Sequence, residues 1–262
     1  MGKMHFRDIV NLKSYPLGKA TFATTCAETL NENGVLVLTD FLRPDALVLL
    51  QEEAERSADK AYFCTQHHSV YLTPPDPTLP PEHPRNRQVE SSKGCICDDV
   101  VAANSPLRQL YDAPEFRSFI KRVTGEQALH PYADSLSSIN IHYAHRGQQL
   151  GWHFDNSSFA ITLLIQKPDG GSRFEYIKDL RNSALGEMNY AGVQALLDGD
   201  LQPNVLSMEP GTLVLFRGRD SVHRVSPNES DTTRMLAVLA YNAEPGVSLS
   251  ESARMTFYGR LA

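Results

Sequence analysis

The most constraining feature of the chain is the triplet His153-Phe154-Asp155, followed far downstream by His223. Alternate side chains of an extended strand point to the same side, so His153 and Asp155 would face one common point. Two imidazoles and one carboxylate leave about three of six octahedral positions open, which suits non-haem Fe(II) with a co-substrate and O2. A His-x-Asp triplet alone is a weak signal. The predicted metal site therefore requires a fold that returns His223 to the triplet.

The surroundings of these residues are typical of a β-rich core. Short β-branched and apolar runs alternate with turns that contain Gly and Pro. The pattern predicts strands over residues 137–143, 159–165, 173–177, 222–225 and 234–241, and a turn with a buried strand over 209–216. A predicted turn over 146–152 leads into His153. The triplet and His223 would then come from different strands of one core.

This combination resembles the Fe(II)/2-oxoglutarate-dependent dioxygenases. Their jelly-roll core carries a His-x-Asp, a distal His preceded by a Pro-Gly-x-Leu-x-x-Phe strand, and an Arg about ten residues later. Here the strand motif spans 210–216, and Arg234 follows His223 by 11 residues (234 − 223). The resemblance covers roughly residues 130 to 245. It implies a mainly β fold with α elements: a double-stranded β-helix (jelly-roll, cupin-like) core with flanking N-terminal helices.

The resemblance also implies the cofactors and their ligands. Fe(II) would be bound by His153, Asp155 and His223, with 2-oxoglutarate as co-substrate and O2 as oxidant. Arg234 would pair with the far carboxylate of 2-oxoglutarate. A guanidinium in an apolar strand is costly without such a partner, and the alternative is a salt bridge to a protein acid.

A second contact to 2-oxoglutarate is expected on the first core strand. In several branches of the family an Asn-x-Tyr touches the co-substrate there, and this chain has Asn140 with His142 in place of the Tyr. Both are candidate cofactor-binding residues. A histidine that is simply hydrogen-bonded within the barrel wall is the alternative for His142.

A narrower resemblance concerns the substrate. Residues 151–159, with the terminal Tyr258-Gly259-Arg260, are similar to small enzymes that hydroxylate or halogenate free amino acids, typified by the free-lysine halogenase. Halogenases of this type have a small residue in place of the acid, so that chloride can bind the iron. Asp155 fills that position, so we expect hydroxylation, with release of succinate and CO2.

The expected substrate is a small polar molecule, most simply a free amino acid. Its carboxylate would meet Arg87 or Arg85, and its amine would meet Asp134 or Glu90, because these are the natural charged partners. The alternative is that these charges only solvate loops. By resemblance, the substrate would also contact Asn156 and Tyr258.

The chain of 262 residues is expected to form a single domain in three parts. Residues 1–129 would be an α/β support and lid region, 130–245 the jelly-roll core, and 246–262 a C-terminal segment at the substrate site. Within the first part we predict a helix ending at Gly34, a strand over 35–38, helices over 44–58 and 115–123, and a Pro-rich loop over 73–87 that is a lid or a surface connector. Another helix is predicted over 186–197.

Composition excludes some functions. The net charge is −6 and no basic stripe is present, which argues against nucleic-acid binding. No apolar run approaches the ~20 residues of a membrane helix. Cys26, Cys64, Cys95 and Cys97 lack the spacing of a zinc site and indicate a reduced, cytoplasmic compartment. The protein is expected to be a monomer or a homodimer.

Two alternatives to an amino-acid hydroxylase remain open. One is a hydroxylase of a larger natural product or of a protein side chain. The other is a non-catalytic jelly-roll module that binds a metal or a small acid. Iron-dependent formation of succinate from 2-oxoglutarate separates the enzymes from the binding module.

Overall fold

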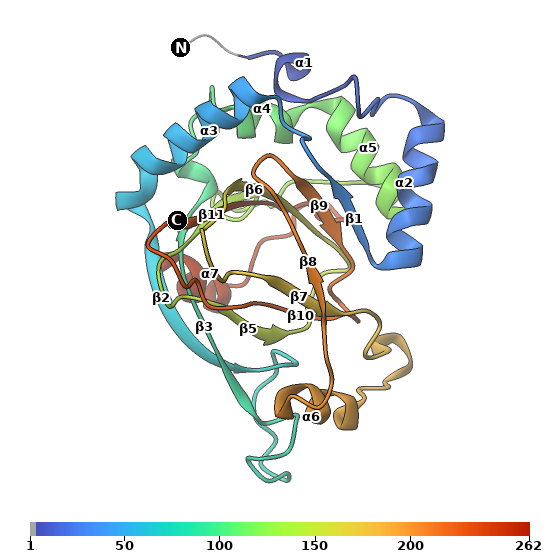
Figure 1. Ribbon diagram of the computed structural model, residues 1–262, viewed down its shortest axis with the longest axis vertical. Coiled ribbons are helices and arrows are strands. Elements are labelled where there is room, and N and C mark those ends of the chain that lie inside the picture. The colour runs from blue at the N-terminus through green and yellow to red at the C-terminus, as the bar shows by residue number, and fades with distance from the viewer. Residues whose placement is uncertain (1–3) are drawn as a thin grey trace.

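The computed structural model describes residues 4–262, so the first three residues of the predicted domain lie outside the described part. Two antiparallel sheets face each other and form the core (Figure 1). The large sheet has the order β1-β9-β6-β11-β4-β3-β2, and the small sheet has the order β5-β10-β7-β8. The strands are β1 (Val35–Leu38), β2 (Tyr62–Ser69), β3 (Gln88–Ile96), β4 (Ile139–Ala144), β5 (Leu150–His153), β6 (Ala160–Gln166), β7 (Phe174–Ile177), β8 (Asn204–Leu206), β9 (Leu213–Phe216), β10 (Val222–Val225) and β11 (Arg234–Leu239). The predicted jelly-roll core is confirmed.

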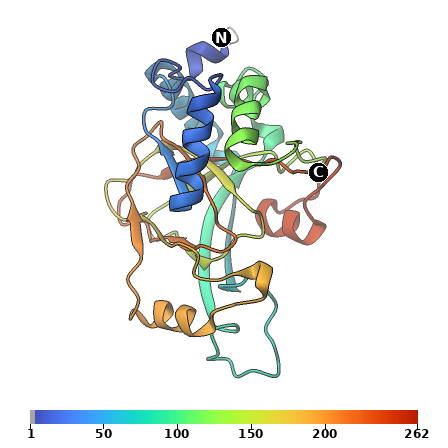
Figure 2. The ribbon, with the colours of Figure 1, turned by 90° about the vertical axis from the view of Figure 1, so that its right-hand side faces the viewer.

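Most helices cover the outer face of the large sheet, and α6 and α7 lie elsewhere (Figures 1 and 2). Helices α2 to α5 share one apolar core with the large sheet. Helix α7 packs against β2 and β3. The helices are α1 (Phe6–Ile9), α2 (Ala20–Asn33), α3 (Pro44–Ser57), α4 (Pro106–Asp112), α5 (Pro114–Thr124), α6 (Tyr190–Asp198) and α7 (Glu251–Tyr258). None of the described helices is long and apolar enough to cross a membrane.

The two faces of the large sheet differ because alternate residues of a strand point to opposite sides. On β11, Met235, Ala237 and Leu239 pack into the core under the helices. Arg234, Leu236 and Val238 instead line the cavity between the sheets. The same alternation on β6 packs its odd-numbered residues under the helices and turns Ala160 and Thr162 to the cavity. The inner face of this sheet is therefore the surface on which a site can be built.

Two long strands of the large sheet were not predicted. β2 and β3 pair along their whole length, from Tyr62↔Cys95 to Ser69↔Gln88, and β3 also pairs with β4. A short strand, β5, stands where only a turn into His153 was expected. The helix α7 near the C-terminus was also missed. These elements contribute much of the inner wall of the cavity.

The Pro-rich segment is a compact loop next to α6, at the end of the molecule opposite α2 to α5 (Figure 1). The amide of Asn86 ties the loop together: it donates to the carbonyls of Asp76 and Leu79 and accepts from the Asp76 amide. Arg87 then pairs with Asp198 at the end of α6. Of the two expectations for 73–87, these contacts fit a connector, and none of its residues lines the cavity between the sheets.

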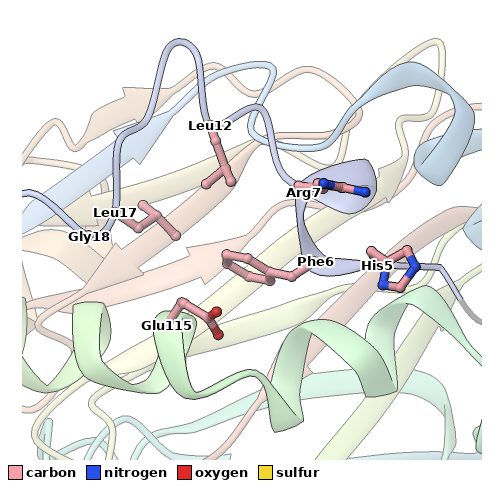
Figure 3. Close-up of a pocket in the computed structure, with 7 residues that line it drawn as sticks. All are labelled: His5, Phe6, Arg7, Leu12, Leu17, Gly18 and Glu115. Atoms are coloured by element: carbon pink, nitrogen blue, oxygen red, sulfur yellow. The ribbon is translucent and has the colours of Figure 1, made fainter.

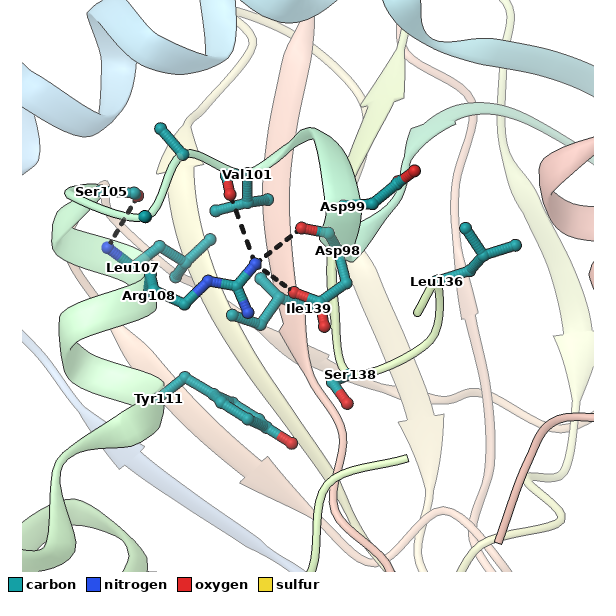
Figure 4. Close-up of polar contacts among 12 residues, drawn as sticks. Asp98, Asp99, Val101, Ser105, Leu107, Arg108, Tyr111, Leu136, Ser138 and Ile139 are labelled. Atoms are coloured by element: carbon teal, nitrogen blue, oxygen red, sulfur yellow. Dashed lines mark hydrogen bonds and ion pairs between the residues drawn. The ribbon is translucent and has the colours of Figure 1, made fainter. Parts of the chain in front are cut away.

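A largely buried ion pair fixes the segment that leads from β3 into α4 (Figure 4). Arg108 Nη2 lies 2.5 Å from Asp98 Oδ1 and donates to the carbonyls of Asp98 and Val101 at 2.7 and 3.3 Å. The hydroxyl of Ser105 caps the start of α4 by accepting from the Leu107 amide. Burial raises the pKa of Asp98, although Arg108 opposes the rise.

Arg108→Met should lower the free energy of unfolding by about 2–4 kcal/mol, because it leaves a buried carboxylate and the Val101 carbonyl without their donor. Urea unfolding followed by circular dichroism measures the loss. The deficit should shrink as the pH is lowered and Asp98 takes up a proton. Arg56→Met, at an exposed pair with Glu52, is the control and should change little. Equal unfolding midpoints for the two variants would contradict the argument.

Candidate active site

Pairing between β5 and β10 brings the predicted metal ligands together. His153 and His223 are direct partners in the antiparallel register of these two strands. The chain leaves β5 after His153, and the Asp155 amide then donates to the Gly218 carbonyl at 2.9 Å. His223 is therefore a neighbour of the triplet 153–155 in the fold, as the predicted metal site required.

The three side chains form one cluster. The ligand atoms of His153, Asp155 and His223 all lie within 4.8 Å of one another, and this is the one such group of His, Cys, Asp or Glu within residues 4–262. Asp155 Oδ1 lies 3.7 Å from His153 Nε2 and 3.6 Å from His223 Nε2. The two imidazole rings are 4.2 Å apart between centroids. This spacing is what a single small cation would bridge.

Backbone carbonyls set the tautomers of both histidines. His153 Nδ1 lies 2.8 Å from the Gly151 carbonyl, and His223 Nδ1 lies 3.1 Å from the Ser221 carbonyl. A carbonyl oxygen only accepts, so each Nδ1 carries the proton and each Nε2 presents a lone pair toward Asp155. Burial and the neighbouring His223 hold the pKa of His153 well below its usual value, which favours the neutral ring that binds metals.

Asp155 fits a metal better than it fits the protein alone. Its Oδ2 is buried and has no hydrogen-bond partner among the described residues. The space for this oxygen exists because residue 218 is glycine: a Cβ there would lie 1.9 Å from Oδ2 and 3.0 Å from His223 Cε1. A buried carboxylate oxygen without a donor is costly, and a cation at the cluster would satisfy it. The residues present therefore fit Fe(II).

The cluster opens into a cavity of about 410 Å³ between the two sheets. Asp155 is the one acidic residue among those that line it, whereas Arg234 and Lys93 bring two cationic side chains. The remaining walls are apolar or neutral. They include Leu72, Leu150, Ala160, Phe174, Met208, Val214, Phe216, Val225, Leu236, Val238 and Phe257, with the polar Cys64, Gln66, His68, Ser91, Tyr132, His142, Asn156, Ser157 and Thr162.

Arg234 reaches the cavity with no protein counter-charge. The residue is buried, at 5% exposure, and no carboxylate of residues 4–262 lies within ion-pair distance of its guanidinium. Burial lowers the pKa of Arg234 to about 10, still far above neutrality. The alternative of an internal salt bridge is therefore excluded for the described part of the chain. A buried guanidinium of this kind calls for an anionic ligand.

The two residues predicted to make a second contact with the co-substrate do not both line the main cavity. His142 lines the main cavity, whereas Asn140 lines a side cavity of about 200 Å³. The Asn140 amide donates to the carbonyls of Leu136 and Ile139 and accepts from the Tyr258 hydroxyl at 3.0 Å. Asn140 and Tyr258 thus satisfy each other and the backbone, and neither lines the main cavity.

The charged residues predicted to meet the substrate lie outside the cavity. Arg87 pairs with Asp198, and Arg85 lies 3.9 Å from Asp76. Asp134 accepts from the amides of Leu136 and Leu249 and from the Ser137 hydroxyl. Glu90 lies near His67 at the surface. Each side chain is engaged in local structure, and of the predicted substrate residues only Asn156 lines the cavity.

Sequence reasoning missed the polar wall that β2 and β3 contribute. Cys64, Gln66 and His68 share one face of β2, and Ser91 and Lys93 share one face of β3. His68 has its ring 6.2 Å from that of His153. The residues of both faces over 65–69 are polar, so no apolar alternation marked this wall in the sequence.

A further cavity, which shares no lining residue with the main cavity, lies between the N-terminal segment and α5 (Figure 3). It is lined by His5, Phe6, Arg7, Leu12, Leu17, Gly18 and Glu115. Phe6, Leu12 and Leu17 gather in its centre, and charged groups stand at the margin. It brings no set of metal-ligating side chains together, so the site is assigned to the cavity between the sheets.

Comparisons with known proteins agree with this fold. The structure is similar to a 2OG-Fe(II) oxygenase family oxidoreductase from Burkholderia pseudomallei (TM-score 0.54, 14% identity, 95% of this chain and 99% of that one). It is similar to the α-ketoglutarate-dependent carbocyclase SnoK from nogalamycin biosynthesis (TM-score 0.59, 14% identity, 97% and 94%) and to a Pseudomonas putida prolyl-4-hydroxylase (TM-score 0.51, 13% identity, 84% and 98%). No curated protein sequence matches the chain.

The fold is thus the one that these non-haem Fe(II)/2-oxoglutarate oxygenases share, as the resemblance implied. The family model described as Halogenase D matches residues 19–256, nearly the whole chain. The chain belongs to the Halogenase D family.

Gly218→Ala should abolish binding of Fe(II), because the added Cβ occupies the place of Asp155 Oδ2. Metal binding is measured by anaerobic titration with Fe(II). Gly18→Ala is the matched control: nothing lies within 4 Å of a Cβ there. Combining Gly218→Ala with Asp155→Gly removes the clash and should restore the stability lost in the single variant. Undiminished Fe(II) affinity in Gly218→Ala would show that Asp155 is not held in this pose.

Proposed function

We propose that this chain is an Fe(II)- and 2-oxoglutarate-dependent oxygenase that hydroxylates an unactivated C–H bond of a small polar substrate, a free amino acid, with release of succinate and CO2. The observation that carries the proposal is the cluster of His153, Asp155 and His223 in a cavity whose wall holds Arg234 without a counter-charge. A dicarboxylate satisfies both features, since one end can reach the metal and the other the guanidinium.

The proposed roles follow from the contacts. His153 and His223 offer Nε2 to Fe(II), because their Nδ1 protons are committed to backbone carbonyls. Asp155 offers its carboxylate, and Arg234 binds and orients the far carboxylate of 2-oxoglutarate. Bound Fe(II), with O2 and 2-oxoglutarate, supplies the oxidising power. The apolar walls, such as Phe216 and Leu236, exclude water from the reacting centre.

Asp155 supports hydroxylation over halogenation within a family named for halogenases. A halide needs a ligand position on the metal that no protein group fills. Asp155 Oδ1 stands 3.6–3.7 Å from both Nε2 atoms, where it would take the third protein position. Oxygen transfer to the substrate is the outcome that three protein ligands favour.

The cavity supports a small substrate. Its volume of about 410 Å³ has to accommodate 2-oxoglutarate as well as the substrate. A free amino acid fits that requirement better than a large natural product. The proposed location is the cytoplasm, which the four free cysteines support.

The direct test is succinate formation from 2-oxoglutarate, with Fe(II) and a panel of free amino acids, together with mass spectrometry for a product that has gained one oxygen atom. We expect both signals in the parent protein and neither in His223→Ala. Exposed His5→Ala is a control. Iron-dependent succinate without any oxidised amino acid would reject the substrate class. No succinate under any condition would reject the activity.

Arg234→Met should raise the KM for 2-oxoglutarate by at least about 30-fold, because removing one partner of a buried charge pair typically costs 2 kcal/mol or more. Arg234→Lys should be intermediate, since it keeps the charge and loses the forked geometry. Arg217→Met, at a guanidinium bound by Asn31 and the Thr124 carbonyl, is the control. An unchanged dependence on 2-oxoglutarate in Arg234→Met would mean that the anchor lies elsewhere.

Asp155→Gly should abolish hydroxylation or reduce it sharply, because the metal loses one of three protein ligands. Product analysis in the presence of chloride measures hydroxylated and chlorinated amino acid together. A chlorinated product would mark the vacated position as accessible to halide. Hydroxylation at the parent rate would show that Asp155 is not a ligand.

A further inference from the structure

Lys93 is a cavity-lining ammonium group without an assigned role. It stands on β3 and lines both the main cavity and the side cavity. Its Nζ lies 3.1–3.2 Å from the two ring nitrogens of His142 and 5.5 Å from the centroid of Phe257. No carboxylate of residues 4–262 lies within 4.0 Å of this ammonium. Lys93 therefore resembles Arg234 in facing the cavity without a counter-charge.

The charges of the cavity do not balance when only the co-substrate is bound. Fe(II) with Asp155 leaves one positive charge, and Arg234 and Lys93 each add another. A 2-oxoglutarate dianion removes two of the three. One positive charge remains in a largely apolar space, where an unpaired charge is costly. Burial lowers the pKa of Lys93 for this reason, and an anion beside it would restore the charged form.

The position of Lys93 separates it from the Arg234 subsite. Arg234 pairs with Ala144 across β11 and β4. Gly94 pairs with Tyr143 across β3 and β4, so the same register continued by one residue sets Lys93 opposite Ala144. The two cations therefore stand in one row with one strand between them, roughly 10 Å apart at their Cα atoms. One carboxylate of 2-oxoglutarate is directed to the metal and the other to Arg234, which leaves Lys93 for a different anion.

His142 fits a supporting role at this position. Its half-buried ring lies within 3.2 Å of Lys93 Nζ, and burial together with Lys93 and Arg234 holds the pKa of His142 well below the usual value. The neutral ring can accept a hydrogen bond from Nζ and so direct the ammonium group. This hydrogen bond would explain why position 142 has a histidine instead of the tyrosine that the resemblance leads one to expect.

We propose that Lys93, oriented by His142, binds the carboxylate of the substrate and makes that carboxylate the charged group by which the site selects it. The inference rests on the proposed function and names its recognition element. No acid except Asp155 lines the cavity, so the substrate's amine meets neutral acceptors only. Selection should therefore be strict for the carboxylate and lenient for the amine.

The test compares Lys93→Met with the parent and with Lys121→Met, the same change at an exposed position of α5. Calorimetry under anaerobic conditions titrates 2-oxoglutarate into the Fe(II)-loaded protein. It then titrates free L-amino acids, their carboxamides and the corresponding 2-hydroxy acids into the Fe(II)–2-oxoglutarate complex. Methionine keeps the length of the side chain, and circular dichroism verifies the fold.

For the parent we expect the amino acid that binds best to be matched within about tenfold by its 2-hydroxy acid, and its carboxamide to bind at least about 30-fold more weakly. Lys93→Met should bring acid and carboxamide to similar affinity and leave the affinity for 2-oxoglutarate within about threefold. Lys121→Met should match the parent.

Three outcomes would overturn the proposal. One is a loss of 2-oxoglutarate affinity in Lys93→Met as large as that in Arg234→Met, which assigns Lys93 to the co-substrate. Another is a parent that binds carboxamides as well as acids. The third is a parent that binds 2-oxoglutarate but none of the carboxylates. Failure of the parent to bind 2-oxoglutarate at all would instead overturn the proposed function, so the two failures are distinguishable.

Discussion

The pairing of β5 with β10 is the interaction on which the site depends. Side chains alternate along a strand, so a slip of one residue would turn His223 away from His153 and the cavity. The register is pinned on the other side as well, where His223 pairs with Tyr176 of β7. Irregular pairing between His223 and Val225 marks the point where the strand bends. The ligand geometry is thus set by backbone hydrogen bonds between the strands.

Polar and charged residues on the inner face of the large sheet lower the stability of the fold. Gln66, Lys93 and Arg234 occupy positions that a purely structural strand would fill with apolar residues. The outer face of the same strands packs Ile141, Ala237 and similar residues under the helices, and this packing holds the sheet despite its polar side. Anionic ligands between the sheets would recover part of the cost, because they bind the folded state alone.

The sequence predicted the parts of the fold whose signal is local. The six predicted core strands are all present in order, because each is a β-branched or apolar run with flanking turns. β2 and β3 escaped prediction because their cavity-facing residues, such as Gln66 and Lys93, are polar and hide the alternation. The substrate residues could not be chosen from sequence, since nothing local shows that Arg87 is engaged by Asp198 or Asp134 by the Leu249 amide. Whether a charged loop residue reaches the cavity depends on the residues that contact it in the folded protein, and these are distant in the sequence.

The approach of Asp155 to Gly218 shows how a residue distant in the sequence makes room for a metal-ligand candidate. An acid at 155 requires the space that a glycine at 218 leaves, because a Cβ would lie 1.9 Å from Oδ2. A small residue at 155 would place no such demand on 218. Residues 155 and 218 lie far apart in the sequence and touch only through the approach of their backbones. The carboxylate at 155 is therefore accommodated in this fold because residue 218 is glycine.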